Sequence, residues 1–242
     1  AYNGEPIADI IDFFILGEGE EVNNEIMDTY KEWKVSKKPR ESFLEAVSRL
    51  EGIYVPSFYD VEYNSDNTVK SVKPNRSGVP GRIRKRIIKE PDSAYMLDKM
   101  IVPFMDIVHD RIMLEIFRGC VRGCRFCQAG YLYRPVREHS PKKLLEAAKK
   151  LIDSTGYEEM SLSSLSTSDY RCLQELIDGL LEITVDKRIN LSLPSLRVDN
   201  FSMELMEKVQ KVKKSGLTFA PEAGTQRLRN VINKNVLEED LL

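Results

Sequence analysis

Four successive strand-then-helix units constrain the fold of the second half of the chain. Short apolar runs occupy residues 112–117, 159–165, 190–193 and 217–220, and a segment with helical spacing of its apolar residues follows each run. The helices are expected at residues 141–155, 169–183, 203–214 and 226–233, with Ser140, Ser168, Ser202 and Thr225 as N-caps and Gly156 and Gly216 as stops. Such alternation favours right-handed crossovers between parallel strands, so the predicted fold class is α/β.

Three cysteines follow the first of these strands directly. Cys120, Cys124 and Cys127 have the spacing C-x3-C-x2-C in a loop rich in Gly and Arg. In parallel sheets the chemistry sits on loops at the carboxyl ends of the strands, which is where this loop is predicted. A protein-held 4Fe-4S cluster usually takes four cysteines, so a trio leaves one iron open to a substrate or cosubstrate.

Two other interpretations of the trio remain open, a zinc site and three ordinary thiols. Zinc normally takes four ligands and favours paired C-x2-C knuckles, but the sequence has no second knuckle. Neither His109 nor His139 has knuckle spacing to the trio. The fourth cysteine, Cys172, lies in a segment with helical spacing and reads as a buried small hydrophobe or an inert helix thiol.

The stretch FRGCVRGCRFCQAG, with Phe126 just before the last cysteine, resembles the signature loop of radical S-adenosylmethionine enzymes. The resemblance implies that the trio binds a 4Fe-4S cluster whose open iron chelates the methionine moiety of S-adenosylmethionine. Reductive cleavage then yields a 5′-deoxyadenosyl radical, which abstracts hydrogen. The resemblance also implies that Phe126 lies near the adenine and that a flavodoxin or ferredoxin type of protein donates the electron.

The similarity extends over about residues 100–235. This region is similar to uncharacterised radical proteins associated with cobalamin domains and, more distantly, to methylthiotransferases that modify RNA or ribosomal protein. Methyl or methylthio transfer, with RNA or protein as the substrate, is therefore the first reaction implied, and radical rearrangement or cyclisation is the second. The family's usual domain is a partial parallel barrel of six units, whereas four are counted in this chain.

Two serines lie near the end of the second predicted strand. Ser163 and Ser164 lie where the family commonly contacts the methionine amino group, although the glycine-glycine-glutamate form of that motif is absent. The simpler interpretation is a Ser/Thr-rich helix cap.

The loops after the third and fourth strands carry three more candidates. Ser195 offers a hydroxyl, and Arg197 could pair with the carboxylate of S-adenosylmethionine, or simply with Asp199 at the surface. Glu222 lies in a glutamate-small-glycine turn like that of many relatives, where it could bind ribose hydroxyls or an ammonium group. Its simpler role would be to favour the N-terminus of the following helix.

The first hundred residues show a different pattern of predicted elements. Residues 1–20 resemble the last strand and turn of a cobalamin-binding-like Rossmann domain, which would imply cobalamin in the full-length protein; the alternative is an edge strand at residues 10–16. Residues 21–104 are predicted as an α+β linker region with helices at 20–36 and 40–50 and a hairpin around residues 65–67.

Residues 105–242 are predicted as a partial (β/α) barrel of the radical S-adenosylmethionine type. Ala1 and the uncapped final pattern VLEEDLL suggest a piece of a longer protein, so this barrel is expected to be truncated at its C-terminal end. The edge of its last strand would then be exposed, and another chain is expected to pair with it.

Charge and cysteine use bear on the partners and the compartment. The 36 basic and 38 acidic residues balance, so no field of the whole chain demands nucleic acid or a membrane. The sequence has no apolar run of spanning length and no signal peptide, and clustered free thiols fit a reducing cytosol, so a cytoplasmic protein is expected.

One segment offers a different class of function. Residues 81–89, GRIRKRIIK, read as a basic, partly alternating strand, and a phosphate backbone could bind residues 82–89. The alternative to an enzyme is then a non-catalytic binding module that holds a cluster or zinc and docks on RNA. The two classes differ in whether S-adenosylmethionine binds the metal centre.

Overall fold

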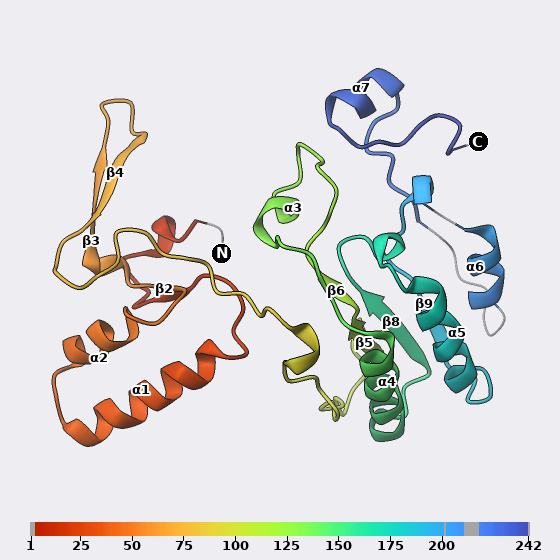
Figure 1. The fold of residues 1–242 in the computed structure, drawn as a ribbon, viewed down its shortest axis with the longest axis horizontal. Coiled ribbons are helices and arrows are strands. Elements are labelled where there is room, and N and C mark those ends of the chain that lie inside the picture. The colour runs from red at the N-terminus through yellow and green to blue at the C-terminus, as the bar shows by residue number, and fades with distance from the viewer. Residues whose placement is uncertain (1–2, 201, 211–217, 242) are drawn as a thin grey trace. The chain divides into compact units, whose positions relative to one another are not determined.

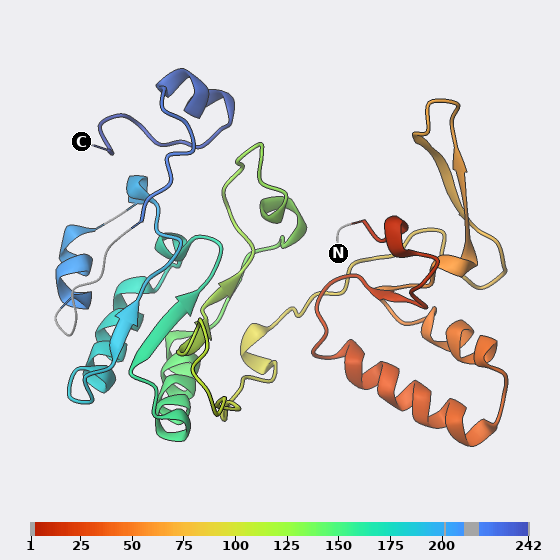
Figure 2. The same cartoon turned by 180° about the vertical axis from the view of Figure 1, so that it is seen from behind.

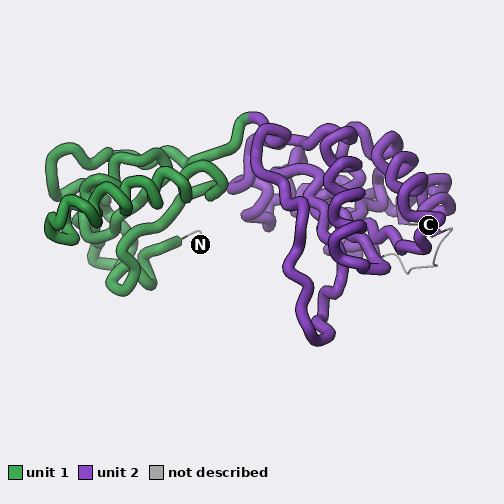
Figure 3. Tube along the Cα trace, turned by 90° about the horizontal axis from the view of Figure 1, so that it is seen from below, with its two compact units in different colours: residues 1–89 green, residues 90–242 purple. Residues whose placement is uncertain are grey.

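The chain divides after residue 89 into two units, each with its own core (Figure 1). The computed structural model describes residues 3–200, 202–210 and 218–241. Figure 2 shows the chain from behind, and Figure 3 colours the two units, Ala1–Lys89 and Glu90–Leu242. Within the described residues, no helix has both the length and the apolar character that crossing a membrane requires.

The first unit packs two helices against a short antiparallel pair of strands. Strand β1 (Phe14–Ile15) pairs with β2 (Ile53–Tyr54), and the helices are α1 (Val22–Ser36) and α2 (Arg40–Val47). The core consists of Val22, Leu44, Val47, Ile53, Val55 and Phe58. Residues before and after position 20 thus belong to the same unit, while the relation of residues 1–20 to a cobalamin-binding domain stays a prediction.

A hairpin forms where turn residues separate two β-rich runs. Strands β3 (Tyr59–Tyr63) and β4 (Val69–Pro74) pair antiparallel, with Val61 opposite Val72. The turn suits its sequence, because Asn67 adopts a left-handed φ of 63° and the Asp66 carboxylate accepts a hydrogen bond from the Thr68 amide at 3.0 Å.

The prediction of a strand over residues 81–89 is wrong. The segment makes one isolated bridge, between Gly17 and Arg86, and a Cβ on Gly17 would lie 2.0 Å from the Arg86 carbonyl oxygen. The Arg86 guanidinium instead turns onto α1, where it donates to Glu25 at 2.6 Å and to Glu21 at 2.8 Å. Those two hydrogen bonds raise the pKa of Arg86. The charge of Arg86 is therefore balanced within the first unit.

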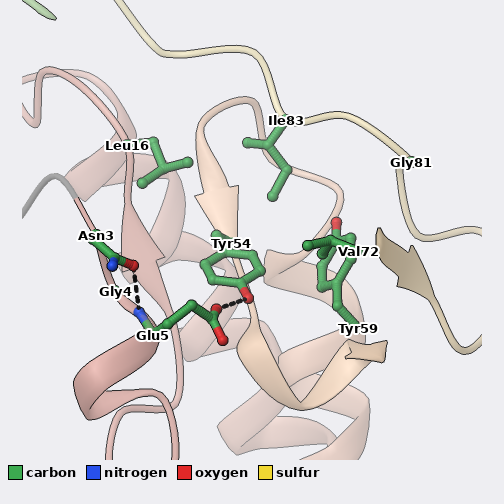
Figure 4. Close-up of a pocket in the computed structure, with 9 residues that line it drawn as sticks. All are labelled: Asn3, Gly4, Glu5, Leu16, Tyr54, Tyr59, Val72, Gly81 and Ile83. Carbon is green, nitrogen blue, oxygen red and sulfur yellow. Dashed lines mark hydrogen bonds between the residues drawn. The ribbon is translucent and has the colours of Figure 1, made fainter. Parts of the chain in front are cut away.

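A depression of about 350 Å³ lies at the base of the hairpin (Figure 4). Leu16, Val72 and Ile83 contribute apolar walls. The polar groups around it are satisfied by the chain, because the Tyr54 hydroxyl donates to Glu5 at 2.7 Å and the Tyr59 hydroxyl donates to the Pro80 carbonyl at 2.7 Å. Burial first, and Glu5 second, raise the pKa of Tyr54. The two tyrosine hydroxyls at the depression are therefore already hydrogen-bonded within the chain.

The second unit is built on a parallel sheet, as predicted. Strands β5 (Ile112–Glu115), β8 (Glu159–Ser163) and β9 (Asn190–Ser192) pair in this order, and both pairings are parallel. Helices α4 (Pro141–Thr155) and α5 (Leu173–Thr184) make the two crossovers. This is the start of a (β/α) barrel, and the described strands do not close on themselves.

The two faces of the sheet differ in chemistry. Ile112 lies beside Met160, and Met160 beside Leu191. All three are buried in one core with residues of α4 and α5, the helices that cover one face of the sheet (Figures 1 and 2). Residues one position further along each strand point to the other face, because side chains alternate along a strand. These residues are Met113, Ser161 and Ser192. The face away from the helices therefore carries hydroxyl groups.

Three of the four predicted helix N-caps are confirmed. The side chains of Ser140, Ser202 and Thr225 each accept a hydrogen bond, at 3.3 Å, from the amide three residues later. Helix α4 also ends at Gly156, which has a left-handed φ of 71°. Helices α6 (Met203–Val209) and α7 (Gln226–Val231) follow the other two caps.

The boundaries of the second and third predicted helices differ from the structure. A 3-10 turn occupies Thr167–Asp169, and α5 begins only at Leu173, with Cys172 at the N-cap. Ser168 does not cap the helix, because its hydroxyl accepts from the Arg197 amide at 3.3 Å. Of the third helix, residues 211–214 and its stop at Gly216 lie outside the described residues.

Two strand predictions also need correction. The fourth strand was expected at residues 217–220; residue 217 lies outside the described residues, and residues 218–220 form no strand. The first strand ends early, before Ile116. The Ile116 amide still donates to the Ser163 carbonyl in β8, but the Ile116 carbonyl accepts from the His139 amide, which lies outside the parallel sheet. The chain then continues as β6 (Phe117–Arg118), which pairs antiparallel with β7 (Arg137–Glu138).

Asp92 should make the stability of the second unit depend on acid pH. Its carboxylate accepts from the Ser140 amide at 3.0 Å and lies 3.2 Å from His139 Nδ1. Burial opposes ionisation, but the bonds from Ser140 and His139 outweigh burial and hold the pKa of Asp92 below its ordinary value of 3.8. A lowered folded pKa contributes stability above the unfolded pKa, and this contribution is lost as the pH falls through the folded pKa.

The test compares the free energy of unfolding of the wild type and Asp92→Asn. The difference should be full at neutral pH and should shrink once the pH falls below 3.8. A difference that stays constant down to the acid transition would contradict the role given to the carboxylate. Lys187→Gln, which breaks an exposed ion pair with Asp153, serves as the control for a general charge effect.

Candidate functional site

The cysteine loop leaves the sheet at the carboxyl end of β5. The short β6–β7 ladder closes its base, with Phe117 opposite Glu138, and the loop carries helix α3 (Ala129–Leu132) (Figure 1). Gly119 turns the chain with a φ of 89°, and a Cβ there would lie 2.8 Å from the Tyr133 carbonyl oxygen. The loop therefore needs glycine immediately before its first cysteine.

Three free, partly buried thiols lie on this loop, as the sequence requires. The Cys127 amide donates to the Cys124 carbonyl at 3.1 Å, and the Arg122 amide donates to Cys120 Sγ at 3.4 Å. Burial raises the pKa of Cys120; the Arg122 amide opposes this shift, and the charges of Asp169 and of the other two cysteines add to it.

The thiols fit an iron–sulfur cluster by donor type and by their place on one short loop. Over the described ranges, no group of three or more His, Cys, Asp or Glu side chains converges in the manner of ligands to one metal ion. A 4Fe-4S cluster does not need such convergence, because each cysteine binds a different iron atom.

An arginine from the cysteine loop reaches the loops that follow the other two strands. Arg122 Nε donates to Asp169 at 2.8 Å, Arg122 Nη2 bonds the second oxygen of the same carboxylate, and Nη1 donates to Asp199 at 3.2 Å. Arg197 also donates to Asp199, from Nε at 2.9 Å and from Nη2 at 3.0 Å. We refer to Arg122, Asp169, Asp199 and Arg197 as the arginine–aspartate cluster.

The arginine–aspartate cluster is largely withdrawn from solvent. The side chains of Asp169, Arg197 and Asp199 are 8%, 8% and 12% exposed. Burial of Asp169 opposes ionisation, yet the hydrogen bonds from Arg122 and Ser166 hold its pKa below the ordinary value. The Asp169 hydrogen bond in turn raises the pKa of Arg122. Two cations and two anions thus balance at the carboxyl end of the sheet.

The chain after α7 contacts the cysteine loop at a separate point. Arg125 donates from its amide to the Ile232 carbonyl at 2.9 Å and from its guanidinium to the Val231 carbonyl at 2.6 Å. The Asn233 side chain donates to the Gly123 carbonyl at 2.8 Å. The cysteine loop is therefore held at two places, by the arginine–aspartate cluster and by residues 231–233.

The predicted serines lie at the carboxyl end of β8 and on the loops that follow β8 and β9. Ser163 ends β8, and its carbonyl accepts from the Ile116 amide at 3.0 Å. The Ser164 hydroxyl lies 2.9 Å from that of Thr167. Ser195 adopts a left-handed φ of 58°, and its carbonyl accepts from the Thr167 amide at 3.2 Å. Contacts of these serines with a cosubstrate stay a prediction.

The other three predicted residues have distinct surroundings. Arg197 is joined to the cysteine loop through Asp199 and also donates to the Lys234 carbonyl at 2.5 Å, so its ion pair is buried rather than on the surface. Glu222 has a left-handed φ of 67°, and its carboxylate lies 3.2 Å from Lys234 Nζ. Phe126 is 55% exposed. Their roles toward a cosubstrate also stay predictions.

The sequence analysis missed Arg122, Asp169 and Asn233 as anchors of the loop. A signal existed for two of them: Arg122 stands between the first two cysteines, and Asp169 ends the polar loop after the second strand. The rule that directs attention to the carboxyl ends of parallel strands would have included both. For Asn233 the sequence offers no such signal, because its contact depends on how the chain returns after α7.

Comparison with known proteins gives two family matches. A model described as the radical SAM superfamily matches residues 114–242, which is more than half of the chain. A second, described as radical SAM proteins, N-terminal, matches residues 1–56.

Two curated relatives come from Methanocaldococcus jannaschii. One is an uncharacterised protein, 36% identical over 129 residues, which are 53% of this chain and 28% of that protein. The other is provisionally named a methylthiotransferase and is 23% identical over 137 residues, covering 53% of this chain and 30% of that protein. The chain thus spans less than a third of the length of each relative.

Proposed function

Because the chain belongs to the radical S-adenosylmethionine superfamily, we propose that Cys120, Cys124 and Cys127 bind a 4Fe-4S cluster that cleaves S-adenosylmethionine reductively. When bound and reduced, such a cluster supplies one electron that splits the C5′–S bond and releases methionine and a 5′-deoxyadenosyl radical. The observation that supports this proposal is the position of the three thiols, on one loop at the carboxyl end of a parallel sheet.

The residues around the loop would orient the cosubstrate. Phe126 offers an exposed ring for the adenine. The hydroxyls of Ser164 and Ser195 and the carboxylate of Glu222 offer hydrogen-bond partners for the ammonium group and the ribose. Arg197 donates from Nε to Asp199 and from Nη2 to the Lys234 carbonyl. It would therefore position the loops around the carboxylate of the cosubstrate.

Methyl or methylthio transfer is the finer reaction that we propose, with RNA or protein as the substrate. The similarity to the protein provisionally named a methylthiotransferase supports it. A flavodoxin or ferredoxin type of protein would supply the electron in the cytoplasm, and cobalamin would be used by the full-length protein.

Strand β9 has one described neighbour, so a further chain or segment would cover its open edge.

The test is anaerobic reconstitution with iron and sulfide, followed by reduction and electron paramagnetic resonance with and without S-adenosylmethionine. The proposal expects a cluster signal that shifts on adding the cosubstrate, together with formation of 5′-deoxyadenosine. Iron uptake without a shift would contradict the open iron, and preferential binding of zinc would contradict the enzyme and favour the binding module.

A further inference from the structure

We propose that Arg122 is a positioning residue that fixes the cysteine loop against the loops after β8 and β9 before any cluster is bound. This inference deepens the proposed function and rests on it for its consequence, which is tighter binding of the cluster. The contacts that carry it belong to the chain alone.

The position of Arg122 suits this role. It lies between Cys120 and Cys124, and its side chain is 23% exposed. Its guanidinium engages both oxygens of Asp169 and one oxygen of Asp199. A planar fork with five donors can bond two carboxylates at once, which a lysine ammonium cannot do with the same geometry.

Each of the two carboxylates is itself fixed by its own loop. Asp169 accepts from the Ser166 hydroxyl at 2.7 Å, and Asn200 donates to the Ser168 carbonyl at 2.6 Å. Asp199 is held by Arg197. Arg122 therefore docks into a preformed acidic site that joins the ends of two strands, and the cysteine loop takes its position from the sheet.

Burial makes these contacts stronger than a surface ion pair. Removing one partner of a buried pair is costly, because the other charge stays buried and uncompensated. Without Arg122, Asp169 would keep its bonds from the Ser166 hydroxyl and from the Asn200 side-chain amide but would lose its cation. The loop would still be held by Arg125 and Asn233 on its other side, so local opening is expected rather than global unfolding.

Fixing the loop in advance should favour cluster binding. A loop that is ordered before binding loses less conformational entropy when its thiols take their ligand positions. A loop held only at one side would sample more conformations, and the same three thiols would bind iron more weakly. Arg122 acts in this way by positioning the cysteines.

The first measurement is amide hydrogen exchange, followed by mass spectrometry, of the protein without a cluster. Arg122→Gln should raise exchange in residues 118–133 by about tenfold or more, the size expected for losing a charged, buried hydrogen-bonded pair. Peptides from α4 should exchange as in the wild type. Arg122→Lys, which keeps the charge without the fork, should lie between the two.

Arg111→Gln is the matched control. Arg111 is 27% exposed and donates to Glu159 at 2.6 Å, so it forms a similar ion pair at the opposite end of the same sheet. Exchange in residues 118–133 that is no faster in Arg122→Gln than in Arg111→Gln would overturn the inference. If Arg122→Gln does not fold, Asp199→Asn replaces it, because this change weakens the same contact. Its exchange in residues 118–133 is then compared with that of Arg111→Gln.

The second measurement is the retention of iron by reconstituted protein against a chelator. Arg122→Gln should lose iron about tenfold faster than Arg111→Gln, and Arg122→Lys should recover part of the difference. Equal rates would overturn the consequence drawn for the cluster. If the wild type takes up no cluster, the proposed function fails, while hydrogen exchange still decides whether Arg122 fixes the loop.

Discussion

Replacing Cys124 with alanine should lower the iron bound after reconstitution from about four atoms per chain to the background level. The reason is that a three-cysteine site has no spare protein ligand: two thiolates hold such a cluster poorly, and no fourth cysteine lies on the loop. Folding should be preserved, because Cys124 is partly exposed and lies outside the core of the second unit. Iron and sulfide assays with the absorption spectrum measure the effect.

Cys172→Ala provides the matched control for that experiment. Cys172 stands at the N-cap of α5, outside the cysteine loop, and packs against the core of the second unit. Iron content should stay at the wild-type level. A full iron complement in Cys124→Ala would remove the cluster assignment, and a loss of iron in Cys172→Ala would mean four protein ligands and no open iron.

Helix starts and the parallel sheet could be predicted because their causes are local or periodic. Ser140, Ser202 and Thr225 cap their helices with their own side chains, and Gly156 ends α4 because glycine has no Cβ and adopts the left-handed φ without strain. The alternation of buried runs with amphipathic segments identified the strands β5, β8 and β9 in their order along the chain.

The errors arose where a distant contact overrides the local pattern. Arg86 was expected in a strand, but its guanidinium binds Glu25 on α1 and Glu21 at the N-cap of α1. Ser168 was expected as a cap, but the Arg197 amide uses its hydroxyl. The first strand was expected to run through Ile116, where the chain instead exchanges one pairing partner for another. None of these partners is near in sequence.

The candidate site divides in the same way. The spacing of the three cysteines was visible in the sequence, and so was their place after a strand. Which groups hold the loop was not visible, because Asp169 and Asp199 come from two further strand–helix units and Asn233 comes from the chain after α7. A parallel sheet assembles such a site only once its strands are paired.

Leu162→Ala should destabilise the second unit by about 2–5 kcal/mol, the range for deleting a buried leucine side chain. Leu162 lies on β8, between β5 and β9, and its side chain is 0% exposed. It is paired with Leu114 on the face that the helices cover. Alanine would leave a cavity between the sheet and the helices and would loosen the strand that leads to Asp169.

Leu165→Ala is the control, since Leu165 is the same residue type three positions later and is 42% exposed. The loss of unfolding free energy in Leu165→Ala should stay within about 0.5 kcal/mol. Hydrogen exchange of α4 and α5 peptides reports the second unit, whereas fluorescence of Trp33, the single tryptophan, reports the first and should keep its midpoint. Equal losses of unfolding free energy at the two leucines would contradict the assignment of Leu162 to the buried face of the sheet. They would also contradict the sheet arrangement that positions the cysteine loop.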